Sequence, residues 1–230
     1  MTSPVVTARG LTRVYGEGET AVHALRGVDL DIASGRLTAV MGPSGSGKST
    51  LMHVLAGLDK PDGGSVSIAG VEVTGLDDKG LTELRREHIG FIFQFFNLLP
   101  MLTARENIVL PSEIAGEEVD AAWLDELVEK IGLTDRLGHR PSELSGGQQQ
   151  RVAVARSLAS RPTVLFADEP TGNLDSTTSA EILELLRSAV DGFGQTTVMV
   201  THDPGAARFA DRVVHLEDGQ IASDETQVPS

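Results

Sequence analysis

The sequence predicts an α/β fold that begins with antiparallel strands and contains an inserted helical segment. A short apolar run at 37–41 precedes a glycine-rich turn and a helical pattern. Strand-like runs separated by helical stretches return later in the chain, at 163–167, 196–200 and 212–216. This alternation is typical of a parallel sheet. The residues between the two parts, about 103–160, repeat apolar side chains at helical spacing.

The first ninety residues are expected to hold several antiparallel strands around the glycine-rich turn. Residues 5–14 predict a strand that ends in a turn-rich loop beginning at Tyr15. Residues 28–32 alternate apolar and acidic side chains, which is typical of a strand with one solvated face. The Asp-Gly-Gly turn at 62–64 separates the first helix from a further strand at 65–68.

The later elements complete the predicted organisation as one domain over 1–230. Helical spacing recurs at Trp123, Leu124, Leu127, Val128 and Ile131, and again at Ile182, Leu185, Leu186 and Val190. We expect a core with a β subdomain at about 1–93 and 161–221, and a helical subdomain at about 94–160. The polar residues 222–230 predict a loose tail.

Composition excludes several classes of protein. The net charge is −14, with 33 acidic and 19 basic residues, which disfavours a protein that neutralises nucleic-acid phosphates. The chain has no cysteine, so disulfides and thiolate metal sites are excluded, and a cytoplasmic location fits. The N-terminus lacks the basic and apolar regions of a signal peptide. The longest apolar run, 91–102, is too short to cross a bilayer, so we expect no direct membrane insertion.

The turn after the strand at 37–41 matches the phosphate-binding loop, in which two glycines separated by four residues precede Lys and Ser. The matching residues are Gly42, Pro43, Ser44, Gly45, Ser46, Gly47, Lys48, Ser49 and Thr50. Backbone N–H groups and a helix N-terminus directed at one point suit a polyphosphate. Lys48 would reach the β- and γ-phosphates, and the Ser49 hydroxyl would hold Mg²⁺. A flexible turn explains a shorter glycine motif, but the complete pattern predicts a P-loop NTPase core that binds a nucleoside triphosphate.

Two carboxylates follow the apolar run at 163–167. Asp168 stands where a P-loop enzyme places its second Mg²⁺ contact, at the carboxyl end of a buried strand. Glu169 lies one residue further on, where it can point at an attacking water. A strand followed by an acidic turn is the alternative, and the phosphate-binding loop in the same chain disfavours it.

A second glycine motif, Leu144-Ser145-Gly146-Gly147-Gln148, precedes a predicted helix at 151–159. Ser145 is a good N-cap, so this helix N-terminus offers a second anion site. The five residues match the LSGGQ signature. With it the chain resembles the ATP-binding subunit of an ABC transporter over nearly its whole length. Residues 41–47, 93–100 and 171–175 resemble the branch of the macrolide-export and lipoprotein-release ATPases, MacB and LolD.

This resemblance implies roles for further residues. Gln94 matches the Q-loop glutamine, which touches Mg²⁺ or water and senses the partner, and Asp175 matches the D-loop at a dimer interface. His202 matches the switch histidine that contacts the γ-phosphate and orients Glu169. Tyr15 matches the aromatic side chain that stacks on adenine. The alternatives are a strand cap for Gln94, a structural histidine for His202 and a buried ring for Tyr15.

The resemblance also implies partners and a mechanism. Two copies would pack head-to-tail, so that Ser145, Gly146 and Gly147 of one copy cover the ATP bound by Lys48 of the other. ATP binding and hydrolysis would then power an integral membrane permease docked near Gln94–Leu102. The subunit would lie on the cytoplasmic side of the membrane, attached through this permease.

The apolar residues of that docking segment have packing in the core as the alternative. They are Phe95, Phe96, Leu98, Leu99, Met101 and Leu102. Two other functions are less consistent with the sequence. An ABC ATPase acting on DNA or the ribosome would need a coiled coil or a second cassette, and a P-loop kinase has no use for the signature at 144–148.

Overall fold

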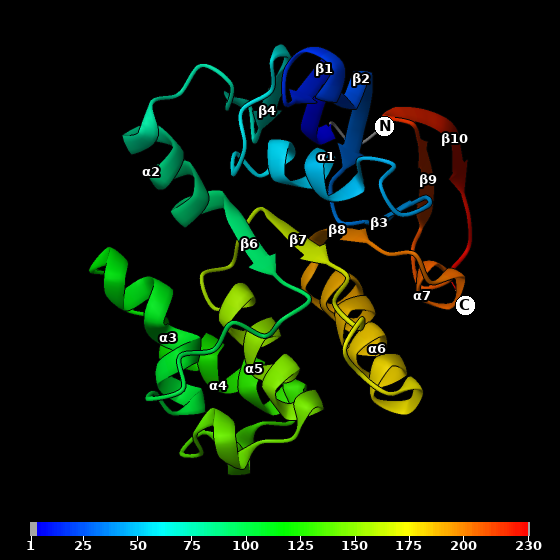
Figure 1. The fold of residues 1–230 in the computed structure, drawn as a ribbon. Coiled ribbons are helices and arrows are strands. Elements are labelled where there is room, and N and C mark those ends of the chain that lie inside the picture. Colours follow the sequence, from blue (N-terminus) through cyan, green and yellow to red (C-terminus); the bar gives the residue numbers. More distant parts are fainter. Residues whose placement is uncertain (1–3, 230) are drawn as a thin grey trace.

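The computed structural model describes residues 4–229, which form two sheets and a group of helices (Figure 1). The expectations for Met1, Thr2 and Ser3, and for Ser230 at the end of the expected tail, lie outside the described residues. In the described part, no helix is both long and apolar enough to cross a membrane.

The first sheet is antiparallel, in the order β2-β1-β4-β5. Its strands are β1 (Pro4–Tyr15), β2 (Val22–Ala33), β4 (Gly63–Ile68) and β5 (Val71–Glu72). The second sheet has the order β10-β9-β3-β8-β7-β6 and is parallel except for the edge strand β10. Its strands are β3 (Leu37–Met41), β6 (Ile89–Ile92), β7 (Val164–Asp168), β8 (Thr196–Val200), β9 (Arg212–Glu217) and β10 (Gln220–Thr226). The predicted antiparallel sheet and parallel α/β core are therefore confirmed.

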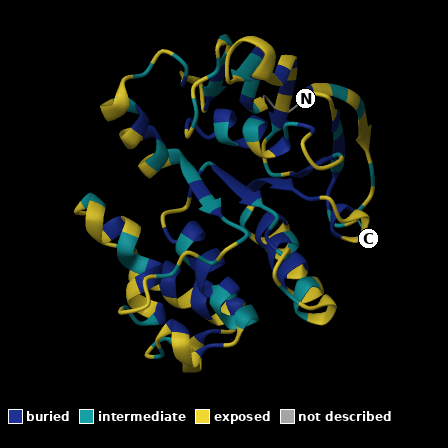
Figure 2. Ribbon diagram, in the orientation of Figure 1, coloured by how far each residue is buried: buried dark blue, intermediate teal, exposed yellow. Residues whose placement is uncertain are grey.

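Successive side chains of a strand point to opposite sides of a sheet. In the parallel sheet both sets are covered, so its central strands are buried on both faces. Val40 and Phe166 pack between the two sheets around helix α1 (Lys48–Leu55). Ala39 and Leu165, their neighbours in sequence, point to the other face and belong to the apolar cluster of the helices on that side. Figure 2 shows β3, β7 and β8 as almost wholly buried, whereas the edge strand β6 is partly intermediate. Two-sided burial explains why their sequences are apolar without alternation.

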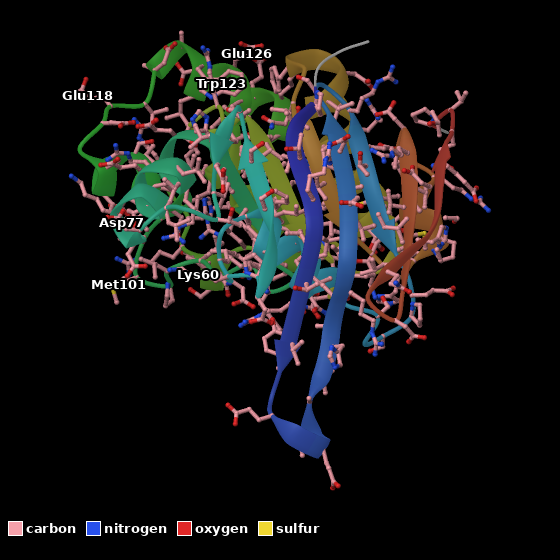
Figure 3. All side chains as sticks on the ribbon, turned by 90° about the horizontal axis from the view of Figure 1, so that it is seen from above. Lys60, Asp77, Met101, Glu118, Trp123 and Glu126 are labelled. Carbon is pink, nitrogen blue, oxygen red and sulfur yellow. The ribbon has the colours of Figure 1, made fainter. Side chains whose placement is uncertain are left out.

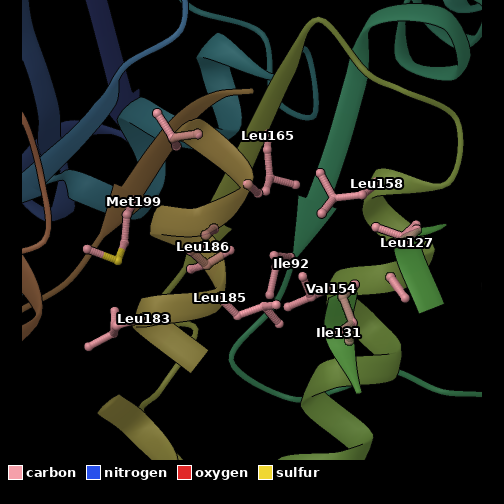
Figure 4. Close-up of a cluster of buried hydrophobic side chains, with 14 of the residues drawn as sticks. Ile92, Leu127, Ile131, Val154, Leu158, Leu165, Leu183, Leu185, Leu186 and Met199 are labelled. Atoms are coloured by element: carbon pink, nitrogen blue, oxygen red, sulfur yellow. The ribbon is translucent and has the colours of Figure 1, made fainter. Parts of the chain in front are cut away.

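The helices on the second face cover the sheet with a continuous apolar cluster (Figure 4). They are α3 (Ala104–Ala115), α4 (Ala121–Ile131), α5 (Gly146–Leu158), α6 (Ser176–Phe193) and the short α7 (Pro204–Ala207). Single 3₁₀ turns also occur, at η1 (Gly18–Thr20), η2 (Thr134–Arg136) and η3 (Pro141–Glu143). The predicted helical character of about 103–160 is confirmed. Trp123 and Leu127 pack inward as their spacing indicates.

One helix was not expected from the sequence. Helix α2 (Asp78–His88) follows β5 and precedes β6 in the chain. Only Leu81 and Leu84 of its eleven residues are buried. Its start is defined by Asp77, whose side chain accepts a hydrogen bond from the Gly80 N–H at 2.8 Å. With so few apolar residues, the segment offers little periodicity for prediction.

The expectation of a loose tail from Ala222 is wrong for its first five residues. They belong to β10, which pairs antiparallel with β9. Arg212 binds the Asp224 carboxylate across the strand pair, and Gln227 Nε2 donates to the carbonyls of Ala207 and Ala210 at 2.6 and 3.0 Å. Polar side chains thus find partners across the sheet edge, which local composition does not reveal.

A buried carboxylate joins three elements of the parallel core. Asp211, 6% exposed, accepts hydrogen bonds from the Leu37 N–H at 2.8 Å and from the Arg187 and Arg36 guanidinium groups at 2.9 and 3.2 Å. Burial alone would raise the pKa of Asp211. These donors outweigh burial and hold the pKa below its ordinary value.

We expect Asp211→Asn to lower the free energy of unfolding by about 3 kcal/mol at pH 7, because Arg187 loses its buried carboxylate. Chemical denaturation measures the change. Asp191→Asn is the matched control, since Asp191 binds the same Arg187 from an exposed position and should contribute less than about 1 kcal/mol.

The same variant has a pH signature. Folding lowers the pKa of Asp211. The contribution of Asp211 to the free energy of unfolding is therefore complete above the ordinary aspartate pKa of about 3.9, and it is lost as the pH falls through the pKa of Asp211 in the folded protein. The difference in the free energy of unfolding between wild type and Asp211→Asn should therefore become smaller in acid. A difference that stayed constant into strong acid would contradict the assignment.

Candidate functional site

The turn between β3 and α1 brings the backbone closer to its neighbours than a side chain would allow. Gly42 and Gly47 have φ of 149° and 101°. A Cβ at Gly42 would collide with the Leu216 carbonyl oxygen, and one at Gly47 with that of Ala24. Helix α1 begins at Lys48 without a side-chain cap in the described structure, so its first N–H groups face the cavity beside the loop. Such an N-terminus is an anion site.

Lys48 is buried among these groups. Its Nζ donates to the Gly42 and Pro43 carbonyl oxygens at 2.9 and 2.8 Å. Burial lowers the pKa of Lys48, although the nearby Glu169 and Asp168 carboxylates act in the opposite direction. The site therefore holds a desolvated ammonium next to its glycine-rich loop, which favours an anionic ligand.

Asp168, at the end of β7, lies beside the first turn of α1. The Ser49 hydroxyl donates to its Oδ1 at 3.2 Å, and His53 Nε2 is 3.8 Å from its Oδ2. Burial raises the pKa of Asp168 above its ordinary value, while His53 and Ser49 act to lower it. Among residues 4–229 no group of three or more His, Cys, Asp or Glu side chains forms a metal site. One carboxylate and one hydroxyl fit Mg²⁺, which typically takes its other ligands from phosphates and water.

Glu169 and His202 face each other across the ends of β7 and β8. His202 Nδ1 is 2.9 Å from Glu169 Oε1. Glu169 has a φ of 45°, in the left-handed region that few non-glycine residues adopt. Its N–H donates to the Val200 carbonyl at 2.9 Å, so the neighbouring strand fixes this turn. Strained backbone of this kind recurs at functional sites.

Tyr15 lies at the end of β1, where the β1–β2 hairpin extends beyond the body of the molecule (Figure 3). Its hydroxyl donates to Asp59 Oδ2 at 2.6 Å, and the Arg13 guanidinium lies 4.7 Å from its ring centre. The ring is 41% exposed. The alternative of a buried structural ring is therefore wrong.

One cavity of about 620 Å³ unites most of these groups. It is lined by Tyr15, Val22, Ala24, Ser44, Gly45, Gly47, Lys48, Ser49, Thr50, Glu169 and His202. Residues from β1, β2, the phosphate-binding loop, α1 and the ends of β7 and β8 thus meet at one place. The volume suits a small-molecule ligand.

Gln94 follows β6 and does not line this cavity. Its side chain packs against Gly172, where an added Cβ would lie 2.9 Å from Gln94 Nε2. Its carbonyl accepts a hydrogen bond from Asn173 Nδ2 at 2.9 Å. The structure therefore joins Gln94 to the segment after Glu169, not to Ser49 or Asp168.

The signature residues also lie outside the cavity. Ser145 caps α5 in a reciprocal pair with Gln148: Gln148 N–H donates to Ser145 Oγ at 3.3 Å, and Ser145 N–H to Gln148 Oε1 at 2.9 Å. This confirms the predicted N-cap. Gly146 and Gly147 begin the helix, and Gly147 packs against the Thr178 side chain.

Asp175 lies next to this signature segment as the N-cap of α6. It accepts hydrogen bonds from the N–H groups of Thr177 and Thr178 at 3.1 and 3.0 Å and from the Thr178 hydroxyl at 2.7 Å. The Thr178 contacts lower the pKa of Asp175. Thr178 therefore connects the two motifs, which lie far apart in the sequence.

Three residues of the site were not predicted from the sequence. His53 follows Ser49 by four residues, so helical spacing alone places both on one face of α1. Arg13 and Asp59 position the Tyr15 ring, with Arg13 Nη2 donating to Asp59 Oδ1 at 2.8 Å. No local signal indicates this pair, because the partners come from different elements.

The ABC transporter family model matches residues 25–172. The chain is 45% identical over 228 residues to the uncharacterized ABC transporter ATP-binding protein MJ0796 of Methanocaldococcus jannaschii, covering 96% of this chain and 97% of that protein. It is 47% identical over 232 residues to the macrolide export ATP-binding/permease protein MacB 1 of Aeromonas hydrophila. That match covers 100% of this chain and 36% of that protein, so the chain spans about a third of the length of this relative.

Solved structures give the same result. A dimeric structure of MJ0796 in a post-hydrolysis state, bound to ADP and Pi, superposes with a TM-score of 0.85 at 42% identity, covering 96% of this chain and 98% of that one. The cbiO1 structure from Clostridium perfringens, part of the ABC transporter complex cbiONQ, has a TM-score of 0.86 at 27% identity, covering 97% and 89%. With the phosphate-binding loop, the paired carboxylates and the signature in one fold, this chain belongs to the ABC transporter family as an ATP-binding ATPase domain.

Proposed function

We propose that this chain binds ATP with Mg²⁺ in the 620 Å³ cavity and hydrolyses it within a head-to-tail pair of copies that drives a membrane permease. The observation that carries the proposal is the separation of two half-sites. The cavity contains the phosphate-binding loop, Glu169 and His202, whereas the signature residues 145–147 lie outside it.

The phosphate-binding loop would hold the ATP phosphates. Residues 42–50 offer backbone N–H groups, and Lys48 Nζ would exchange the Gly42 and Pro43 carbonyls for β- and γ-phosphate oxygens. Ser49 and Asp168 would hold Mg²⁺. Gln94, which contacts Gly172 and Asn173 in this structure, would have to move toward them to become a further ligand. When bound there, Mg²⁺ supplies positive charge that stabilises the phosphoryl oxygens. Tyr15 would stack on the adenine ring, supported by Arg13 and Asp59.

Glu169 would act as the general base for the attacking water. His202 would orient its carboxylate through the 2.9 Å contact and would reach the γ-phosphate from its exposed position. The turn at Glu169 is fixed by Val200, so the carboxylate is oriented before the substrate binds.

A second copy would complete each site. Ser145 is exposed, and its helix N-terminus would bind the γ-phosphate held by the other copy, with Asp175 beside the interface. The dimeric structures of MJ0796 support a pair of copies. ATP at a hundred times its dissociation constant for the closed pair would contribute roughly 2.7 kcal/mol per site to closure. This difference between the closed and the open pair would convert binding into movement.

The permease would contact the segment 94–102. Phe95 and Met101 are 68% and 72% exposed, whereas Leu98 packs against the core, so core packing accounts for only part of this segment. The buried Asn107 fixes the segment, since its side chain bonds the N–H and carbonyl of Leu99 at 2.8 and 3.2 Å. MacB 1, a macrolide export ATP-binding/permease protein, supports such a partner and an export role. Transmission of force to the permease is the other role we propose, and in both cases the chain would lie at the inner face of the membrane.

Glu169→Gln should slow ATP hydrolysis on the order of 10²–10⁴-fold, because the water loses its base. ATP affinity should remain, and an ATP-bound dimer should accumulate in size-exclusion chromatography. Glu184→Gln on the exposed face of α6 is the control and should behave as wild type. Normal turnover by Glu169→Gln would remove Glu169 from this role.

Ser145→Arg in one copy should impair hydrolysis at the Lys48 site of the other copy. Mixed dimers that carry Lys48→Ala in one defined chain leave a single working site whose rate can be measured. If Ser145→Arg reduces the rate only when it is in the same chain as the working Lys48, the sites are not shared and the head-to-tail pair is wrong.

Exchanging both Phe95 and Met101 for Glu should abolish binding to the permease subunit and leave the ATPase activity of the isolated chain intact, because neither residue lines the cavity. Co-purification from membranes measures the first effect. Val71→Glu, at an exposed apolar residue of the other sheet, is the control. Unchanged co-purification of the double variant would exclude this segment as the docking surface.

A further inference from the structure

Gln150 is a fully buried amide in the second turn of α5, with 0% of its surface exposed. Its Nε2 donates to the carbonyl oxygen of Pro170 at 2.6 Å. Pro170 is itself buried and directly follows Glu169. A side chain of the signature helix therefore contacts the backbone next to the proposed general base of the same chain.

The other end of this amide is unusual for a group that serves packing alone. Gln150 Oε1 is buried and has no hydrogen-bond partner among the described residues. An apolar side chain of similar volume would avoid that cost. We conclude that the contact with Pro170, and not the filling of space, accounts for an amide at this position.

The turn that Gln150 contacts determines where the Glu169 carboxylate points. Glu169 adopts its φ of 45° with its N–H bonded to Val200 on one side, and its carbonyl accepts the Gly172 N–H at 3.0 Å. Gln150, from helix α5, binds the same turn at the Pro170 carbonyl. Displacement of α5 would thus displace the Pro170 carbonyl and rotate the neighbouring carboxylate.

We propose that Gln150 is a positioning residue that couples Glu169 to the location of α5. The inference rests on the proposed function, in which residues 145–147 of this helix cover the ATP of the second copy. Seating of the helix on the partner's nucleotide would then align Glu169 in the helix's own chain. One hydrogen bond would make hydrolysis at one site depend on completion of the other.

The test uses the full chain with Gln150→Met, which replaces the amide by an apolar side chain of similar length. The kcat for ATP should fall on the order of 10- to 100-fold, because small misplacements of a catalytic group have effects of this size. The KM for ATP should stay unchanged, and the ATP-bound dimer should accumulate as it does for Glu169→Gln. Gln149→Met is the matched control, since Gln149 precedes Gln150 in the same helix and its amide donates to the Leu144 carbonyl instead of Pro170. It should retain the wild-type kcat.

Three results would overturn the proposal. The first is an unchanged kcat in Gln150→Met, and the second is an equal loss of kcat in Gln149→Met. The third is a Gln150→Met variant that is slow but no longer forms the ATP-bound dimer, which would mean damage to the signature end of α5. Thermal unfolding verifies that the variants are folded. If Gln150→Met does not fold, Gln150→Leu, which also lacks the amide donor, is judged by the same criteria. Normal hydrolysis by Glu169→Gln, measured in parallel, would instead refute the proposed function.

Discussion

The parallel alignment of strands that are buried on both faces is the constraint on which this structure depends. Since β3, β6, β7 and β8 run in the same direction, their carboxyl ends meet at one edge of the sheet. That edge carries the phosphate-binding loop, Asp168, Glu169 and His202. Burial on two faces leaves these strands no freedom to slip in register, since a shift by one residue would exchange the two cores. The precision of the candidate site is therefore a consequence of packing far from it.

The sequence predicted the parts of the site that depend on local patterns. A phosphate-binding loop, a carboxylate at a strand end and a capping serine each act through neighbours within a few residues, so residues 42–50, Asp168 and Ser145 were identified directly. Gln94, His202 and Tyr15 required the resemblance to a family. Their spacing in the sequence does not indicate a chemical role, because the three residues come close to the site only when the strands assemble.

The parts that were missed depend on partners from distant elements. The tail was expected to be loose because its composition is polar, yet Asp224 finds Arg212 across a strand pair. Helix α2 was not predicted because it buries only two leucines and so shows little apolar periodicity. Gln150 looks like one more glutamine in a polar helix turn until the fold brings Pro170 against it. In each case the deciding interaction forms only after the chain has folded.

The position of Tyr15 has a consequence for nucleotide binding. The ring stands on a hairpin of the antiparallel sheet, while the phosphate-binding loop follows a strand of the parallel sheet. On the proposed function, the base and the phosphates of one nucleotide are recognised by separate structural layers. The strength of stacking on the base can then vary through hairpin substitutions while the chemistry at the sheet edge stays the same, which makes affinity for the base an independently adjustable property of this ATPase.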